Sequence, residues 1–341
     1  MRRSTAGLLG SVGVAGSLLV ALGLSAAAPM PALGDTSPTT SAPPGTAVSR
    51  IAGRDRIETA IGVSNVAFQA NGSAQVVVLS RWDGFADALA GTPLAVAKVG
   101  PILLTPGDAL DARTEFELKR VLPAGATVYV LGGEAAISDP VATQVTKDGY
   151  TVKRLGGNNR FATAVKVAQE VGTPATILLA TGNNPGDALA SGAAAAKING
   201  VVVLSNDATM PPETAAYLSA NGSVPVDAVG GQAAAADRSA TPVVGADRFA
   251  TSVAVAQKFF SNPTAVGIAN GFAFPDALSG GPAVGQLGGP LVLVDYVHLP
   301  QSIHDYLVSV HSTIQIAELY GGESVVTSGE ESALNGALRG T

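Results

Sequence analysis

Hydrophobic and polar positions follow two alternating patterns from about residue 50 to the end of the chain. Short, continuously apolar runs at 74–80, 175–181 and 264–270 predict strands that are buried on both faces. Segments between such runs, for example IETAIGVSNVAF from residue 57, place apolar residues at helical spacing. Because strands and helices alternate, we expect an α/β protein whose mostly parallel sheets lie between layers of helices.

The pattern occurs three times, and four motifs mark each copy. The first motif is GRDRIETA at 53–60, which returns as GNNRFATA at 157–164 and as GADRFATS at 245–252. The other motifs are Asp-Ala-Leu from residues 87, 187 and 276, an apolar strand from 101, 201 and 290, and Gly-Gly from 132, 230 and 321. Because four motifs recur in the same order, the chain contains three copies of one unit.

Each copy predicts a helix after its opening motif, a helix at Asp-Ala-Leu and a third helix, which begins near Asp111 in the first copy. Units of this size are near the lower limit for an independent domain, so the copies are expected to bury surface against one another. A closed ring with pseudo-threefold symmetry would provide three equivalent interfaces, whereas an open row would leave two ends uncovered. Both arrangements fit the sequence.

Composition restricts the kinds of partner. The chain has 20 Lys and Arg against 26 Asp and Glu, a net charge of −6, and −8 without Arg2 and Arg3. This acidity argues against nucleic acid as a partner, and any site for a polyanion must be a local basic pocket. Cysteine is absent, which excludes disulfides, thiolate zinc sites and thiol nucleophiles.

The N-terminus has the layout of an export signal, with Arg2 and Arg3 before an uncharged stretch that ends at Asp35. We expect a signal peptide over 1–28, with cleavage as late as residue 34 as a second option, and hence a secreted protein with no membrane span after cleavage. A retained membrane anchor is the competing interpretation. Residues 29–49, rich in Pro, Ser and Thr, are expected to be a flexible linker.

The sequence offers little for catalysis. All three histidines, His298, His304 and His311, lie in the third copy, and neither a GxSxG nor an HExxH motif is found. His304 and His311 are expected to be exposed residues of one helix. We therefore expect a protein without enzymatic activity, metal site or cofactor.

The copies resemble the cell wall binding repeat 2 family, whose opening reads R-[IL]-x-G-x-[DN]-R-[FI]-x-T-A. Residues 50–60 and 154–164 match this opening, and a weaker match begins at Val243. The resemblance extends over about 50–335 and divides the chain into copies at 50–153, 154–241 and 242–341. It implies a Gram-positive surface protein with three Toprim-like α/β units around a pseudo-threefold axis, held noncovalently on an anionic polysaccharide or teichoic-acid-like polymer of the wall.

Three sets of residues are implied by the resemblance as contacts to the polymer. They are the arginines Arg56, Arg160 and Arg248, the aspartates Asp87, Asp187 and Asp276, and the strand triplets, above all Ile102, Leu103 and Leu104. The copies depart from the family pattern at Pro242, where an arginine is expected, and at Asn159, where an acid is expected. Three equivalent sites are therefore not expected.

Several of these residues also have structural interpretations. Asp55, Asn159 and Asp247 are expected to cap helices, with Glu58 completing a capping box. The arginines then fall in the first helical turn, which is unfavourable for a cation, so each needs a partner. That partner is a motif aspartate, another ion pair, or a phosphate or carboxylate of the polymer. The aspartates themselves are either helix caps or ligand contacts at the carboxyl ends of strands.

The expected function is wall binding by a secreted monomer that has no room for a further domain. The alternative is a peptidoglycan hydrolase of the amidase type, or an activator of one. Three similar grooves would favour binding, whereas a single unique polar pocket would favour an enzyme.

Overall fold

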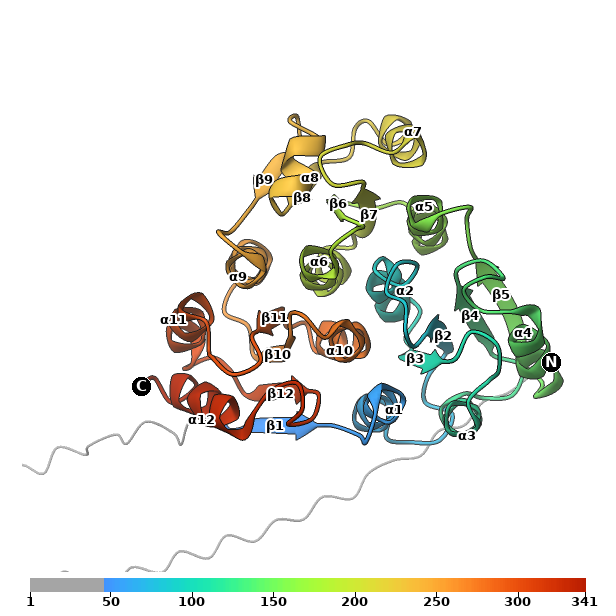
Figure 1. Ribbon diagram of the computed structural model, residues 1–341, viewed down its shortest axis with the longest axis horizontal. Helices are drawn as coiled ribbons and strands as arrows, with labels where there is room; N and C mark the ends of the chain where they lie inside the picture. The colour runs from blue at the N-terminus through green and yellow to red at the C-terminus, as the bar shows by residue number, and fades with distance from the viewer. Residues whose placement is uncertain (1–45) are drawn as a thin grey trace, which may run out of the picture. The chain divides into compact units, whose positions relative to one another are not determined.

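In residues 46–341, which the computed structural model describes, three sheets of four parallel strands are arranged around a group of central helices (Figure 1). The strand orders are β3-β2-β4-β5, β7-β6-β8-β9 and β11-β10-β12-β1. The strands are β1 (Val48–Ile51), β2 (Val76–Arg81), β3 (Ile102–Thr105), β4 (Thr127–Leu131), β5 (Thr151–Leu155), β6 (Ile177–Thr181), β7 (Val201–Ser205), β8 (Val226–Val229), β9 (Thr241–Val243), β10 (Ala265–Asn270), β11 (Leu291–Val294) and β12 (Ile316–Tyr320). The expected α/β class with parallel sheets is confirmed.

The fourth strand of each sheet lies just before the opening motif of the next copy. β5 and β9, which open the second and third copies, pair with β4 and β8 of the preceding copy. β1, which opens the first copy, pairs with β12 of the last, with Val48 opposite Ala317 and Ile51 opposite Tyr320. The chain therefore closes its row of three copies into a ring, which leaves no unpaired end.

Helices cover both faces of the sheets. They are α1 (Arg56–Ala67), α2 (Gly91–Ala97), α3 (Ala112–Val121), α4 (Asp139–Lys147), α5 (Arg160–Val171), α6 (Pro185–Lys197), α7 (Pro212–Ala220), α8 (Gly231–Ala236), α9 (Arg248–Phe259), α10 (Phe274–Gln286), α11 (Gln301–Val310) and α12 (Ser328–Ala337). The helices expected after the opening motifs and near Asp111 are present. The sequence did not predict α4, α8 and α12, or the strands β1, β5 and β9.

The Asp-Ala-Leu motif is helical in only two copies. It lies within α6 and α10, but in the first copy Asp87 and its neighbours form turns, and α2 begins only at Gly91. Both α6 and α10 have a proline in the first turn, a position that favours helix initiation. The first copy has Phe85 and Ala86 there instead, so the expectation of a helix at its motif is wrong.

Three equivalent helices, α2, α6 and α10, form the hub of the ring, where each packs against the other two (Figure 1). Thr92, Gly192 and Gly281 occupy the same position in these helices, five residues after the motif aspartate. A Cβ atom on Gly192 would lie 2.7 Å from the Thr92 Cβ, and one on Gly281 would lie 2.9 Å from the Thr92 Oγ1. The axis therefore has room for one side chain, which the first copy supplies.

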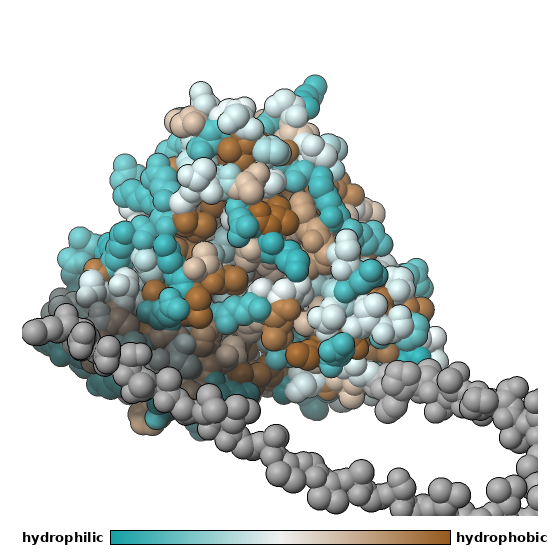
Figure 2. All heavy atoms as spheres, turned by 180° about the vertical axis from the view of Figure 1, so that it is seen from behind, coloured by the Kyte–Doolittle hydropathy of each residue, from teal (hydrophilic) through white to brown (hydrophobic). Residues whose placement is uncertain are grey.

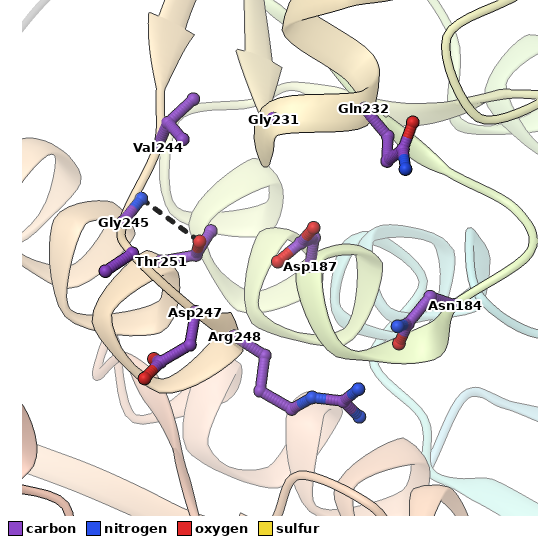
Figure 3. Close-up of a pocket in the computed structure, with 10 residues that line it drawn as sticks. Asn184, Asp187, Gly231, Gln232, Val244, Gly245, Asp247, Arg248 and Thr251 are labelled. Atoms are coloured by element: carbon purple, nitrogen blue, oxygen red, sulfur yellow. Dashed lines mark hydrogen bonds between the residues drawn. The ribbon is translucent and has the colours of Figure 1, made fainter.

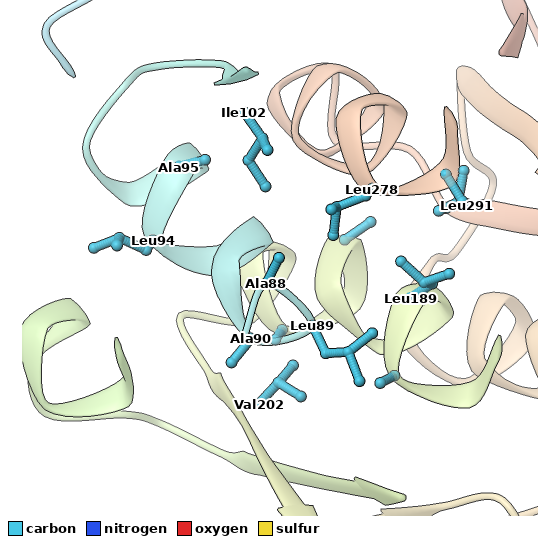
Figure 4. Packing of buried hydrophobic residues seen from close by; sticks show 14 of the residues in the cluster. Ala88, Leu89, Ala90, Leu94, Ala95, Ile102, Leu189, Val202, Leu278 and Leu291 are labelled. Carbon is cyan, nitrogen blue, oxygen red and sulfur yellow. The ribbon is translucent and has the colours of Figure 1, made fainter. Parts of the chain in front are cut away.

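One hydrophobic cluster runs through all three copies. It includes the motif leucines Leu89, Leu189 and Leu278, and Figure 4 shows them together with Val202 and Leu291 from two of the sheets. Separate clusters lie on the outer side of each sheet, beneath its outer helices. Each sheet is thus buried on both faces, as the continuously apolar strands predicted.

The three predicted helix caps are confirmed. The side chains of Asp55, Asn159 and Asp247 accept hydrogen bonds from the backbone of the residue three positions later, at 2.9, 2.8 and 2.8 Å. The capping box differs from the expected one, because Glu58 Oε2 accepts from the Arg54 N–H, one residue before the cap. Glu58 also accepts a hydrogen bond from the Arg54 side chain, so its carboxylate binds Arg54 rather than the backbone of the capping residue Asp55.

The beginning of the described region corrects the predicted linker. Val48 and Ser49 belong to β1, and Thr46 donates a hydrogen bond of 2.6 Å to the Ile314 carbonyl, so the expected linker over 29–49 extends too far. The predicted signal peptide lies outside the described residues, as does the rest of the linker. None of the helices in residues 46–341 has both the length and the apolar character that a membrane span requires.

The surface is mixed in character. On the face shown in Figure 2, hydrophobic residues lie in small patches between hydrophilic ones. Two aromatic residues have large exposed fractions: Trp82, at 36%, directly follows β2, and Phe272, at 59%, lies two residues after the end of β10. Both belong to the site described below.

Glu330 is an acid at a core position. It is 2% exposed, and neither of its carboxyl oxygens has a hydrogen-bond partner among residues 46–341. The corresponding residue of the first copy, nine positions after the first glycine of the pair, is the buried Val141. Burial, together with the nearby charge of Asp295, raises the pKa of Glu330 to about 7.

Replacing Glu330 is expected to change how stability depends on pH. Because the folded state holds this proton more tightly than the unfolded chain, whose pKa is near 4.5, the unfolding free energy falls as pH rises from about 4.5 to 7. The shift corresponds to about 3 kcal/mol at pH 8. We expect Glu330→Gln to remove this loss, so urea unfolding should find the variant more stable than the parent at pH 8 but not at pH 4.5. If the parent and the variant had the same urea unfolding curve at pH 8 as well as at pH 4.5, the raised pKa of Glu330 would be contradicted.

Candidate functional site

Each junction between copies brings together three repeated residues. The motif aspartate and the Gly-Gly pair come from one copy, and the opening arginine comes from the next copy around the ring. The first junction holds Asp87, Gly132 and Arg160, the second Asp187, Gly230 and Arg248, and the third Asp276, Gly321 and Arg56. The third junction joins the last copy to the first, so it depends on ring closure.

The Gly-Gly pairs hold the aspartates. The first glycine of each pair has a positive φ, of 94° at Gly132, 85° at Gly230 and 114° at Gly321. A Cβ atom at these positions would approach an oxygen of the motif aspartate to 2.8, 2.0 and 2.8 Å. Both the backbone conformation and the close approach therefore require glycine. The first glycine of each pair thus leaves space for the carboxyl group of the motif aspartate. The sequence did not suggest this role.

The arginines bind a carbonyl group and an aromatic ring. Their Nη1 atoms donate to the carbonyl of the residue that follows β2, β6 or β10, at 3.1 Å for Trp82, 2.6 Å for Gly182 and 2.7 Å for Gly271. The guanidinium groups of Arg56, Arg160 and Arg248 lie 5.1, 5.6 and 4.3 Å from the rings of Trp82, Phe85 and Phe272. These cation–π contacts stabilise each side chain in an extended position.

In the part of the chain that the structure describes, no carboxylate forms an ion pair with these arginines. Among the ion pairs formed within residues 46–341, none involves Arg56, Arg160 or Arg248. The expected pairing with a motif aspartate or another acid is therefore absent from the described region, and the partner that the helix start requires is a carbonyl. Each guanidinium keeps further N–H groups for a ligand.

Two of the junctions are open grooves. The second is a groove of about 520 Å³ lined by Asn184 and Asp187 from α6, Gln232 from α8, and Arg248 and Thr251 from α9. Figure 3 shows Asp187 and Arg248 entering this space from α6 and α9. The third junction is a groove of about 270 Å³, and its lining includes Arg56, Thr59, Trp82 and Asp276. Both grooves thus present an arginine, an aspartate and a threonine of the same motifs.

Burial raises the pKa of two motif aspartates. The pKa of Asp187 rises to about 6, although the positive charge of Arg248 acts in the opposite direction. The pKa of Asp276 also rises to about 6 through burial, against a hydrogen bond from Thr59 and the charge of Arg56. Desolvation therefore outweighs the attraction of the arginines, and both groups change charge just below neutral pH.

The first junction differs from the other two. Here the ring that faces the arginine is Phe85, which belongs to the preceding copy rather than to the copy of Arg160 itself. Phe85 also makes an edge contact with Phe274 of the third copy, at 5.3 Å between ring centroids. The three junctions therefore differ in the aromatic ring that faces the arginine. The aromatic partners could have been found from the sequence, because Trp82 and Phe272 follow strand ends.

The strand triplets belong to the core. Ile102, Leu103 and Leu104 in β3 are at most 1% exposed, and the corresponding residues of β7 and β11 are equally buried. Their side chains cannot contact a polymer from solvent. The interpretation of Ile102, Leu103 and Leu104 as polymer contacts is therefore replaced by a structural role beneath the site.

The histidines lie away from the grooves. His304 is half-buried on α11 and His311 is half-buried at its end, where it contacts the Val308 carbonyl, so neither is an exposed helix residue as expected. His298 lies in the loop before this helix. Within residues 46–341, no three acidic or histidine side chains come close enough to hold a metal ion.

Comparisons with known proteins agree with the threefold pattern. The family model of cell wall binding domain 2 (CWB2) matches residues 50–142, 154–239 and 243–331. The N-acetylmuramoyl-L-alanine amidase LytC of Bacillus subtilis is 28% identical over 254 residues, 73% of this chain and 50% of LytC. The amidase enhancer of Bacillus subtilis is 33% identical over 141 residues, 41% of this chain and 19% of that protein. The chain thus spans half or less of these relatives.

Two solved structures from Clostridium difficile have a similar fold. Cwp8 has a TM-score of 0.77 at 23% identity, covering 87% of this chain and 52% of Cwp8. Cwp6 has a TM-score of 0.75 at 25% identity, covering 85% of this chain and 48% of Cwp6. The family model matches most of the chain, and each match contains the arginine and the Asp-Ala-Leu motif. The chain therefore belongs to the cell wall binding domain 2 family, of which it carries three tandem copies.

Proposed function

We propose that residues 46–341 bind an anionic polymer of a bacterial cell wall in the grooves of the second and third junctions, without catalysing a reaction. Membership of the CWB2 family and the likeness to Cwp8 and Cwp6 support cell wall binding. The observation that supports an anionic ligand is the pair of arginines, Arg56 and Arg248, which face open grooves without an acidic partner. In a protein of net charge −6, such groups provide the local positive charge that a polyanion requires.

The groove chemistry fits a charged saccharide chain. A guanidinium group binds phosphate or carboxylate oxygens through two parallel N–H groups. Trp82 and Phe272 remain partly exposed beside Arg56 and Arg248, and an aromatic face can pack against the apolar face of a sugar ring. The recurrence of the same groups in two grooves favours polymer binding over a single catalytic pocket.

An amidase, or an activator of one, is the second candidate. It is supported by the names of the two curated relatives, of which this chain spans 50% and 19%. Walls incubated with the protein should keep their turbidity and release no peptides if binding is the whole function. Loss of turbidity would favour the second candidate.

Replacing both groove arginines is expected to weaken wall binding. We expect Arg56→Ala combined with Arg248→Ala to lower the affinity by about a hundredfold, since each charge-assisted hydrogen bond contributes about 1.5 kcal/mol or more. The measurement is cosedimentation with purified bacterial walls, before and after chemical removal of the secondary polymer. Binding of the parent protein should be lost when the polymer is removed.

The matched control is Arg238→Ala combined with Arg339→Ala, which removes two positive charges from exposed positions outside the grooves. This control should bind as the parent does. If it weakens binding as much as the groove variant, attraction depends on overall charge and the grooves are not the site. Unchanged binding to stripped walls would reject the polymer as the ligand.

A further inference from the structure

Both proposed grooves contain a carboxyl group of the same sign as their ligand. Asp276 is 6% exposed and Asp187 is half-buried, and each is pressed against the backbone of a Gly-Gly pair. Among the ion pairs formed within residues 46–341, none joins either aspartate to the arginine of its groove. Gly230 and Gly321 have no Cβ atom, which leaves the space that these two carboxyl groups occupy inside the grooves.

The charged groups around each aspartate come from the next copy of the ring. Asp187 faces Arg248 and the capping residue Asp247, both at the start of α9. Asp276 faces Arg56 at the start of α1, with Arg54 and Asp55 in the same lining. The neighbouring Thr251 and Thr59 do not titrate. Each groove therefore has an aspartate whose charge opposes an incoming anion, directly beside the arginine that attracts it.

We propose that the two grooves take up their anionic ligand together with a proton, which Asp187 and Asp276 carry as neutral carboxyl groups. This inference rests on the proposed function and concerns the same grooves. The neutral carboxyl donates its O–H to an anionic oxygen of a phosphate or carboxylate group, while the neighbouring guanidinium binds other oxygens of that group. The proton comes from solvent and returns to it when the ligand leaves.

The direction of the effect follows from electrostatics. A negative ligand disfavours the ionised aspartate, so binding and protonation stabilise each other. The carboxyl groups of both free grooves already have a pKa near 6, because burial disfavours their charged form. Above this pH each groove must gain a proton on binding, and affinity must fall as pH rises.

The experiment is cosedimentation with unstripped bacterial walls at pH 5, 6, 7 and 8 and constant ionic strength. If each groove binds only in its protonated form, affinity at pH 7 is about tenfold lower than at pH 5. Carboxylates of the wall itself lose charge at lower pH, which weakens an anionic ligand and so opposes this trend. A rise in binding at pH 5 therefore cannot come from the wall.

Asparagine resembles the neutral carboxyl group in size and can donate a hydrogen bond. Asp187→Asn combined with Asp276→Asn should therefore bind at pH 7 as tightly as the parent binds at pH 5, with little dependence on pH. The control Asp305→Asn, at an exposed site on α11, should keep the pH profile of the parent. A flat profile for the parent, or an unchanged profile for the double variant, would overturn proton-linked binding.

A second measurement does not depend on variants. Mixing the protein with the same walls in unbuffered salt at pH 6.5 should raise the pH, because binding takes up protons. Binding without a pH change contradicts proton linkage but leaves the proposed function intact. Absence of binding at every pH, by contrast, rejects the proposed function itself.

Discussion

Removal of β1 is expected to lower the unfolding temperature by about 10 °C, because a loss of roughly 4 kcal/mol shifts a protein of this size by 2 to 4 °C per kcal/mol. The strand contributes the buried Ile51 and the ladder with β12. It also contributes Arg50, which binds Glu331 at 2.7 Å and the Gly321 carbonyl at 2.8 Å. The measurement compares thermal unfolding of chains that begin at Thr46 and at Gly53.

The chain that begins at Thr46 is the control, because it lacks residues 1–45 but keeps β1. Loss of β1 also uncovers the edge of β12, so the shorter chain should self-associate in size-exclusion chromatography. Equal unfolding temperatures would show that ring closure contributes little to stability. The groove of the third junction should be lost as well, since β1 anchors the short segment 52–55 that leads to Arg56 at the start of α1.

A threonine added at the ring axis is expected to destabilise the protein, and removal of the original threonine should restore its stability. Gly192→Thr adds a side chain where even a Cβ atom would lie 2.7 Å from Thr92. We expect this overpacking to cost about 3 kcal/mol. Adding Thr92→Gly moves the single threonine from α2 to α6, and should recover the parent stability to within about 1 kcal/mol.

Urea unfolding of the two single variants, the double variant and the parent gives the coupling energy directly. Gly336→Ala in α12 is the matched control for a helical glycine, because its Cβ would lie 3.4 Å from the nearest neighbouring atom, the Thr341 Oγ1. It should leave stability unchanged or raise it slightly. Additive effects of the two axis substitutions would contradict the contact between Thr92 and Gly192.

Much of the fold could be predicted because its signals are local. Apolar runs such as 175–181 identify strands that are buried on both faces, and Asp55, Asn159 and Asp247 identify helix starts by their own hydrogen bonds. The opening strands β1, β5 and β9 were not predicted, because they are short and partly exposed and each completes the sheet of another copy. Their pairing depends on contacts with a different copy, and no periodic pattern of apolar residues in the sequence indicates it.

The site was predicted in part for a similar reason. The repeated arginines and aspartates do meet at the junctions, but only the structure shows that they come from different copies. The residue whose carbonyl each arginine binds differs between copies. It is Trp82 in the first copy and a glycine, Gly182 or Gly271, in the other two. The buried triplet at 102–104 was misassigned because repetition marks core positions as strongly as binding positions.

The single threonine on the axis has a consequence for how this protein can change over time. Three copies of the first unit would bring three threonines into a space that holds one, and three copies of the second would leave that space empty. No perfect triplication of one present-day copy can therefore fill the hub. In this chain the copies therefore cannot replace one another without changing the packing at the axis.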